Sequence, residues 1–284
     1  MANIVVTGAS GFIGQALCRS LYQRGHKVVT LSSQDGQIAD PRVFSRIGEA
    51  RHVFHLAGRT FVPNSWKDPQ EFMNVNVLGT TNVLEFCRAQ GVPLTFVSAY
   101  LYGVPERLPI QEACVPRPNN PYALSKYLAE QICEFYAAHY GMDITVVRPF
   151  NIFGPGQKPH FLIPQIVSQV KERQTIRVKD LAPRRDYIYI DDLVDALVRT
   201  VDAHRGYNVF NIGSGSSISV RELITVIQTV AGTELPVVSE DRVRHNEIDD
   251  VYADISKARA LLGWDPNITF QQGIERMLVK ESSS

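Results

Sequence analysis

One stretch near the N-terminus constrains the fold more than any other part of the sequence. A short apolar run, Asn3 to Thr7, is followed at once by Thr7-Gly8-Ala9-Ser10-Gly11-Phe12-Ile13-Gly14 and then by a helical pattern. In such a strand–turn–helix unit a pyrophosphate can sit on the helix N-terminus only if no side chains stand in its way. The spacing is GxxGxxG, where the more common form is GxGxxG. Gly8 permits the tight turn, Gly11 the approach of a phosphate and Gly14 the packing of helix on strand, so the sequence predicts a dinucleotide-binding turn.

The same alternation of strand and helix patterns continues through the first half of the chain. This rhythm is typical of α/β proteins, and it predicts a Rossmann-type, doubly wound parallel sheet. The expected strands are Asn3 to Thr7, Lys27 to Leu31, His52 to Leu56, Leu94 to Val97 and Ile144 to Arg148. The expected helices are Phe12 to Arg24, a short turn at Val43 to Ile47, Pro69 to Ala89, and Tyr122 to Tyr140.

The pattern changes after Arg148-Pro149, where Pro, Gly and basic residues cluster as far as Pro164. We therefore predict a dinucleotide-binding domain with the catalytic residues over 1–150. A smaller mixed α/β lobe that binds substrate is expected over 151–284, with segments that can return to the sheet. Two helices are expected in this lobe. Asp191 can cap the segment that runs to Val201, and Ser219 with Glu222 has capping-box spacing.

Composition argues against several classes of partner. The formal net charge is zero, with 29 basic and 29 acidic residues, so we expect neither a nucleic-acid partner nor a charged membrane surface. No run of about 18 apolar residues and no basic, apolar leader is present, and we expect a cytoplasmic protein. The four cysteines are scattered without a CxxC pair, so we expect neither a metal site nor disulfides.

The end of the second expected strand bears on the choice of cofactor. An acidic residue there would hold the ribose 2′-hydroxyl of NAD, but Ser32 occupies the place and no Arg lies beside it. Asp35 lies slightly farther on and can equally be a turn residue. The cofactor is therefore expected to be NADP or NAD, and we favour NADP.

Tyr122 and Lys126 lie at the start of an expected helix, four residues apart and so on one face. A nearby ammonium, together with an oxidised nicotinamide, can lower the pKa of a phenol, which is ordinarily about 10. Tyr122 can then exchange a proton with a sugar hydroxyl. Alone, a YxxxK pattern is frequent by chance, so its weight depends on the motifs around it.

With Phe96-Val97-Ser98 and the glycine turn, this pair resembles the extended short-chain dehydrogenase/reductases, the NAD-dependent epimerase/dehydratase family that acts on nucleotide sugars. The resemblance covers essentially the whole chain and implies catalytic roles for Ser98, Tyr122 and Lys126. The cofactor-binding residues that it implies, together with the glycine-turn reading, are Gly8, Ser10, Gly11, Phe12, Ile13, Ser32, Leu56, Ala57, Gly58, Tyr122, Lys126 and Pro149. The substrate-binding residues that it implies are Ser98, Ala99, Tyr100, Asn151, Arg185 and Arg244, with Asn151 and the two arginines on the diphosphate of a nucleotide sugar.

The residues after Ser98 narrow the reaction within this family. Ala99 and Tyr100 stand where the dehydratases of the family carry Asp and Glu, and Tyr100 stands where GDP-fucose synthases carry a catalytic Cys. The resemblance then implies hydride transfer at C4 of a nucleotide-linked hexose. We favour a 4-keto-6-deoxyhexose reductase, with a UDP-hexose 4-epimerase that retains NAD as the alternative. A non-catalytic dinucleotide sensor or scaffold is the alternative of another class.

The helices expected at Pro69 to Ala89 and Tyr122 to Tyr140 carry apolar residues on more than one face, which a helix that only covers a sheet does not need. In the family the two helices pair with their symmetry mates. We therefore expect a homodimer through a four-helix bundle.

Overall fold

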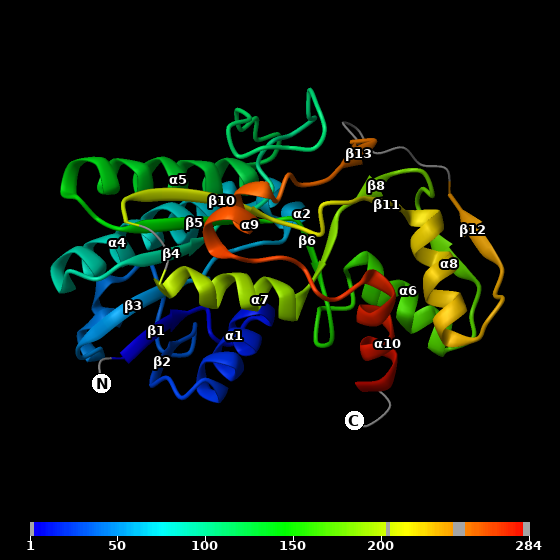
Figure 1. Ribbon diagram of the computed structural model, residues 1–284, viewed down its shortest axis with the longest axis horizontal. Helices are drawn as coiled ribbons and strands as arrows, with labels where there is room; N and C mark the ends of the chain where they lie inside the picture. The colour runs from blue at the N-terminus through cyan, green and yellow to red at the C-terminus, as the bar shows by residue number, and fades with distance from the viewer. Residues whose placement is uncertain (1–2, 203–204, 241–247, 281–284) are drawn as a thin grey trace.

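The computed structural model describes residues 3–202, 205–240 and 248–280, and its centre is a six-stranded sheet (Figure 1). The strand order is β10-β5-β4-β3-β1-β2, and every neighbouring pair is parallel. The strands are β1 (Asn3–Thr7), β2 (Val28–Leu31), β3 (Ala50–His55), β4 (Leu94–Val97), β5 (Ile144–Pro149) and β10 (Tyr207–Ile212). The predicted α/β class with a Rossmann-type parallel sheet is confirmed. The chain reverses its direction of winding between β1 and β3, the place where open parallel sheets bind ligands.

Helices cover both faces of this sheet (Figure 1). On one face lie α1 (Phe12–Gln23) and α7 (Ile190–Arg199), which contact each other, and on the other lie α4 (Gly79–Gln90) and α5 (Pro121–Tyr140). Successive side chains of a strand point to opposite faces, so each strand contributes to two apolar cores.

Strand β1 shows this division. Ile4 and Val6 join the core with Leu17 of α1, whereas Val5 joins the core with Val83 of α4. All three β1 side chains are fully buried. The sheet therefore has apolar residues on both faces, as its flanking helices require.

The helix predicted from Pro69 to Ala89 is not regular. It comprises α3 (Pro69–Met73), a π-helical segment η2 (Asn74–Leu78) and α4. A π segment holds one residue more per turn than an α-helix, and such segments are frequent at functional sites. This one places the side chain of Asn76 in the interior, where it is 1% exposed.

The remaining elements build a lobe beside the sheet and the connections to it. Small sheets of order β11-β8-β13, β12-β7 and β6-β9 lie in this part of the chain, and α6, α8 and α10 group at one end of the molecule (Figure 1). The elements are η1 (Pro41–Arg46), α2 (Val62–Lys67), β6 (Asn151–Phe153), α6 (Leu162–Lys171), β7 (Ile176–Val178), β8 (Arg184–Arg185), β9 (Tyr187–Tyr189), η3 (Thr200–Asp202), β11 (Ile218–Ser219), α8 (Val220–Ala231), β12 (Val237–Ser239), β13 (Asp250–Val251), α9 (Ser256–Leu262) and α10 (Phe270–Lys280). The division into domains at residue 150 stays a prediction.

Of the two predicted helix caps, one is correct. Ser219 and Glu222 form a capping box at the start of α8. Asp191 does not cap α7, because the helix begins one residue earlier and Tyr189 is its N-cap residue. The neighbouring carboxylate of Asp192 accepts hydrogen bonds from the backbone N–H groups of Asn267 and Ile268, at 3.1 and 3.0 Å.

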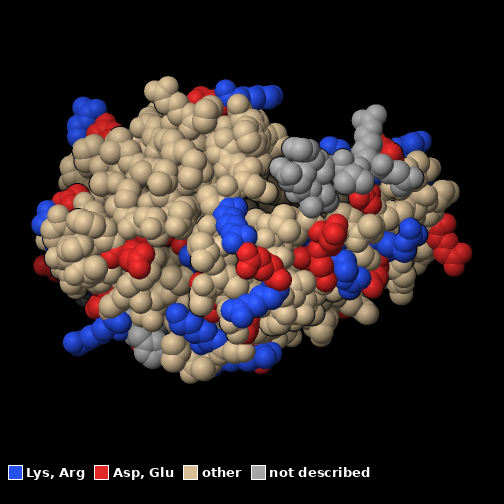
Figure 2. All heavy atoms as spheres, turned by 90° about the horizontal axis from the view of Figure 1, so that it is seen from above, with Lys and Arg blue, Asp and Glu red and all other residues tan. Residues whose placement is uncertain are grey.

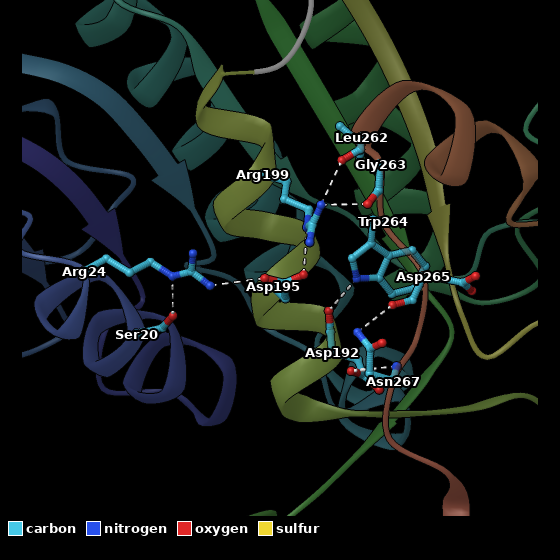
Figure 3. Close-up of polar contacts among 10 residues, drawn as sticks. All are labelled: Ser20, Arg24, Asp192, Asp195, Arg199, Leu262, Gly263, Trp264, Asp265 and Asn267. Carbon is cyan, nitrogen blue, oxygen red and sulfur yellow. Dashed lines mark hydrogen bonds and ion pairs between the residues drawn. The ribbon is translucent and has the colours of Figure 1, made fainter.

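These contacts fix α7 between α1 and the C-terminal segment (Figure 3). The Trp264 indole donates to the carbonyl of Asp192 at 3.0 Å, and Asp195 pairs with both Arg199 and Arg24, the residue directly after α1. Tertiary contacts therefore bind the carboxylate of Asp192, and Asp195 combines a tertiary pair with Arg24 and a local pair with Arg199.

Charged side chains of both signs are interspersed over part of the face in Figure 2, which looks down on the top of Figure 1. On the side where α5 lies, the same face carries few charges. Across the described residues no helix has the length and hydropathy needed to cross a membrane. All four cysteines are free.

Candidate active site

A cleft of about 2540 Å³ lies at the carboxyl ends of the sheet strands and extends into the second lobe. Its lining includes every predicted site residue that the structure describes. These are Gly8, Ser10, Gly11, Phe12, Ile13, Ser32, Leu56, Ala57, Gly58, Ser98, Ala99, Tyr100, Tyr122, Lys126, Pro149, Asn151 and Arg185. Arg244 lies outside the described residues. The structure thus brings the candidates together, while the roles assigned to them stay predictions.

The glycine turn has the backbone that a phosphate cradle requires. Gly8 has a φ of +69°, and a Cβ there would lie 2.6 Å from the backbone N of Ala57. A Cβ on Gly14 would collide with the carbonyl oxygen of Gly8. The first N–H groups of α1 have no partners within the helix and face this turn with the positive end of the helix dipole. The turn therefore fits a dinucleotide diphosphate.

Ser98 directly follows β4 at the bottom of the cleft. Its backbone N–H donates to the carbonyl of Val147 at 2.8 Å, which fixes the residue against β5. The side chain is 4% exposed, and its hydroxyl oxygen has no hydrogen-bond partner among the described residues. Buried hydroxyls are nearly always bonded, so this one is available to a ligand oxygen.

Tyr122 and Lys126 enter the same cleft from α5. The helix begins there because Pro121 occupies its first turn and the Asn120 side chain accepts from the N–H of Ala123 at 2.9 Å. The Lys126 ammonium donates to the carbonyl of Val97, next to Ser98, at 2.6 Å and lies 4.2 Å from the centre of the Phe96 ring. Lys126 thus joins α5 to the end of β4.

Burial governs the protonation of this pair. It lowers the pKa of Lys126 to about 8, an effect that the charge of Glu130 opposes. Burial also raises the pKa of Tyr122 to about 12. The expectation that Lys126 and an oxidised nicotinamide together lower the pKa of the phenol stays a prediction. A phenol of this kind is protonated at neutral pH, which suits a proton donor.

Asn76 supports the site from behind, and the sequence did not reveal it. Its side-chain amide donates to Ser125 Oγ, between the two motif residues of α5, at 2.8 Å, and to the Arg59 carbonyl at 3.1 Å. Its carbonyl oxygen accepts from the Arg59 N–H at 2.8 Å. The amide therefore ties the loop after β3 to the catalytic helix. No spacing in the sequence pointed to it, because the π segment that turns Asn76 inward has no sequence signature.

Glu130 and Arg148 form a buried ion pair behind Lys126. Their side chains are 1% and 6% exposed, and the guanidinium contacts both carboxylate oxygens at 2.5 to 3.1 Å. Burial alone would lower the pKa of Arg148, but the hydrogen bonds and charge of Glu130 outweigh it and raise that pKa. Glu130 lies eight residues after Tyr122, and this helical spacing is the signal that could have found it.

The expected diphosphate residues lie at the second-lobe side of the cleft. Arg185 Nη1 donates to the carbonyls of Arg184 and Ile248 at 2.7 and 2.6 Å. These two bonds hold the guanidinium group in place. The Asn151 side chain donates to the carbonyl of Asp186 at 3.0 Å. The Tyr100 hydroxyl donates to the Gly103 carbonyl at 2.6 Å, so it stabilises the loop after Ser98.

Other polar residues near the cleft have structural partners. Arg59 pairs with Glu71 and Arg184 with Glu222, both at 2.8 Å. The His160 ring lies 4.6 Å from that of Phe61. Within the described ranges, no group of His, Cys, Asp and Glu is suited to a metal ion.

Comparison with known proteins agrees with this geometry. Residues 4–213 match the model of the NAD dependent epimerase/dehydratase family. The chain is 32% identical to GDP-6-deoxy-D-mannose reductase from Pseudomonas aeruginosa, over 97% of this chain and 96% of that protein. It is also 32% identical to UDP-glucose 4-epimerase from Mycolicibacterium smegmatis, over 96% of each. The structure of RMD from Pseudomonas aeruginosa complexed with NADPH superposes with a TM-score of 0.92 at 31% identity, over 100% of this chain and 99% of that one.

Proposed function

The chain belongs to the NAD dependent epimerase/dehydratase family, and we propose that it reduces the C4 ketone of a nucleotide-linked 4-keto-6-deoxyhexose. The observation that carries the proposal is the buried hydroxyl of Ser98, which has no hydrogen-bond partner in the described part of the chain and shares one cleft with Tyr122 and Lys126. The similarity to GDP-6-deoxy-D-mannose reductase supports this substrate class.

The chain's own residues divide the chemistry as follows. When bound at the glycine turn, the nicotinamide cofactor supplies the hydride for C4. Ser98 donates a hydrogen bond to the ketone oxygen and orients it. Tyr122 gives its proton to that oxygen as negative charge develops there, so the product carries a hydroxyl. Lys126 stabilises the phenolate that remains, which recovers a proton from solvent.

The diphosphate of the substrate is assigned to Arg185 and Asn151, with Arg244 as a further candidate. A local guanidinium fork allows a protein without net charge to hold a diphosphate. Arg185 lines the cleft, and its Nη1 contacts to two carbonyls limit its motion, so little entropy is lost on binding.

A UDP-hexose 4-epimerase is the second candidate, because the chain is also 32% identical to UDP-glucose 4-epimerase from Mycolicibacterium smegmatis. The same three residues would serve it, with the proton and hydride first removed and then returned to the opposite face of the sugar. A non-catalytic sensor is disfavoured, because such a protein has no need for Ser98, Tyr122 and Lys126 in one cleft.

The proposal includes a cytoplasmic homodimer. Exposed apolar side chains follow the outer face of α5, at Leu124, Leu128 and Phe135, and Leu78 of η2 is also exposed. The same side of the molecule carries few charges (Figure 2). An isologous contact between two copies of α5 and of the helical segment before it would bury these side chains.

The testing experiment has two steps. The purified protein is first denatured and any released nucleotide is identified. It is then incubated with GDP-4-keto-6-deoxymannose or UDP-glucose and with NADPH or NADH. We expect no retained NAD and stoichiometric oxidation of the added cofactor with the keto sugar. Retained NAD with interconversion of UDP-glucose and UDP-galactose would replace the reductase by the epimerase, and inactivity toward both would contradict the proposal.

A further inference from the structure

We propose that His55 is a positioning residue that couples the glycine turn to the catalytic helix α5 through one chain of hydrogen bonds, an inference that rests on the proposed function. His55 ends β3, and its imidazole is fully buried. Nδ1 lies 2.8 Å from the hydroxyl oxygen of Thr7, which directly precedes Gly8 of the glycine turn. Nε2 lies 3.0 Å from the hydroxyl oxygen of Thr80 in α4. The ring therefore bridges the glycine turn and the helix that follows the π segment.

One end of the chain fixes the direction of every bond in it. A carbonyl oxygen can only accept, so the Thr80 hydroxyl donates to the carbonyl of Asn76 at 2.6 Å. Thr80 Oγ1 has no second proton, and it therefore accepts from Nε2–H of His55. Burial lowers the pKa of His55 to about 3, so the neutral ring accepts at Nδ1 from the Thr7 hydroxyl. The backbone N–H of Ala57 completes the chain by donating to Thr7 Oγ1 at 3.2 Å.

The two ends of the chain hold opposite parts of the cleft. Ala57 lines the cleft beside Gly8, where a Cβ would lie 2.6 Å from the Ala57 backbone N, so the two backbones are in direct contact. At the other end, Thr80 holds the backbone of Asn76, whose side chain donates to Ser125 Oγ of α5 at 2.8 Å. Hydride and proton transfer need the cofactor and the proton donor in fixed alignment, and an error of about 1 Å can cost about 100-fold in rate. The chain supplies this alignment.

The surroundings of the imidazole keep it in the neutral form that the chain requires. The His55 ring stacks on the Phe96 ring with a centroid distance of 5.5 Å. The Lys126 ammonium lies 4.2 Å from the centre of the same Phe96 ring. Burial has the largest effect in lowering the pKa of His55, and the charge of Lys126 adds to it. A protonated imidazole would place a second positive charge behind the ammonium, so the two residues favour opposite charge states.

Thr80→Val is the decisive variant, because it keeps the shape of the side chain and removes its hydroxyl. It leaves the His55 Nε2–H and the Asn76 carbonyl without the partner they share. Thr80→Ser retains the hydroxyl and is the matched control. Thr80 is buried and does not line the cleft, so neither variant changes a group that could touch a ligand there. Steady-state kinetics with the keto sugar give kcat and KM, and calorimetry without sugar gives the NADPH dissociation constant. Long-range ¹H–¹⁵N NMR spectra, assigned with His55→Gln, identify the protonated nitrogen of His55.

We expect the wild-type imidazole to carry its proton on Nε2 at pH 7. Thr80→Val should lower kcat by about 10-fold or more, and change KM and the NADPH dissociation constant by less than about 3-fold. Thr80→Ser should keep at least about half of the wild-type kcat. A proton on Nδ1 in the wild-type protein, which can be detected even if Thr80→Val does not fold, would overturn the inference. Equal kcat values in the two Thr80 variants would also overturn it. A wild-type protein that turns over no nucleotide sugar would instead overturn the proposed function.

Discussion

The guanidinium of Arg148 in β5 holds both carboxylate oxygens of Glu130 in α5, and Glu130 lies one helical turn beyond Lys126. This contact joins the strand that leads into Pro149 and Asn151 to the helix that carries Tyr122 and Lys126. Arg148 also donates to the hydroxyl of Tyr102 at 2.8 Å. The buried Arg148–Glu130 pair therefore holds β5 and α5 in fixed positions, although neither residue lines the cleft.

Removing one member of this pair should be strongly destabilising. Arg148→Met leaves a buried carboxylate without its partner, and we expect the free energy of unfolding to fall by about 3 to 5 kcal/mol in urea titrations. Arg88→Met is the control, because Arg88 and Glu85 form an Arg–Glu pair of similar length, 2.6 Å, with side chains 47% and 44% exposed. Its cost should be at most about 1 kcal/mol. Equal losses in the two variants would contradict the importance of burial.

Ser98→Ala should separate stability from turnover. The hydroxyl is buried without a partner among the described residues, so its loss should leave the free energy of unfolding unchanged or raise it by up to about 1 kcal/mol. Turnover should fall by a factor of about 100 or more, because a hydrogen bond to the reacting oxygen disappears. Parallel thermal unfolding and steady-state kinetics check both effects. A destabilised variant with normal kcat would show that the hydroxyl is structural.

Tyr122→Phe tests the proton donor. Removal of the hydroxyl alone keeps the ring packed, so nucleotide-sugar affinity should change little while kcat falls by a factor of about 100 to 10,000. Lys126→Met should give a comparable loss, and the double variant should be little worse, because the pair acts as a unit. Arg185→Ala is the contrasting variant and should chiefly raise KM. Near-normal kcat for Tyr122→Phe on the accepted substrate would exclude the proposed mechanism.

Two buried histidines should make the protein sensitive to acid. Burial lowers the pKa of His52 to about 3 and that of His55 to about 3. Below pH 6.5 the unfolded chain takes up protons that the folded chain does not, so stability falls as pH falls from about 6.5 toward 3. Each histidine contributes up to about 1.4 kcal/mol per pH unit.

The measurement is urea unfolding between pH 7 and pH 5. In His52→Gln the amide can keep the contact to Thr95, at 2.9 Å in the wild-type protein, and the pH dependence should weaken. The exposed residue His139 provides the control variant, His139→Gln, which should retain the wild-type slope. Identical slopes in the three proteins would contradict the assignment.

The dimer is tested on the outer face of α5. Phe135 is 52% exposed, and Phe135→Glu should convert a dimer to a monomer by light scattering at micromolar concentration, because a charge would be buried in the contact. Val279→Glu, at an apolar residue of α10 that is 69% exposed, is the control. A wild-type monomer would contradict the four-helix bundle.

The sequence predicted elements best where local pattern and tertiary role agree. The predicted strands Asn3–Thr7 and Leu94–Val97 match the observed bounds, because their apolar runs are flanked by residues that favour turns. The prediction of Asp191 as a cap is wrong because its carboxylate pairs instead with Arg276 of α10, at 3.1 Å. Local capping rules contain no information about such partners.

The cleft residues could be found because each lies in a motif at the end of a strand or the start of a helix. A residue that supports the cleft from behind could not be found from the sequence. Asn76 reaches Ser125 through a π segment, so its role depends on backbone geometry rather than on spacing.

Strand β10 has a consequence for the synthesis of the chain. It is an edge of the main sheet and pairs with β5 along its whole length, yet it comes after β6, α6 and α7 in the sequence. On the ribosome, β5 therefore keeps an open hydrogen-bonding edge until residue 212 has emerged. Nascent chains that pause before that point would present a bare strand edge to one another, a hazard for aggregation that the finished protein no longer has there.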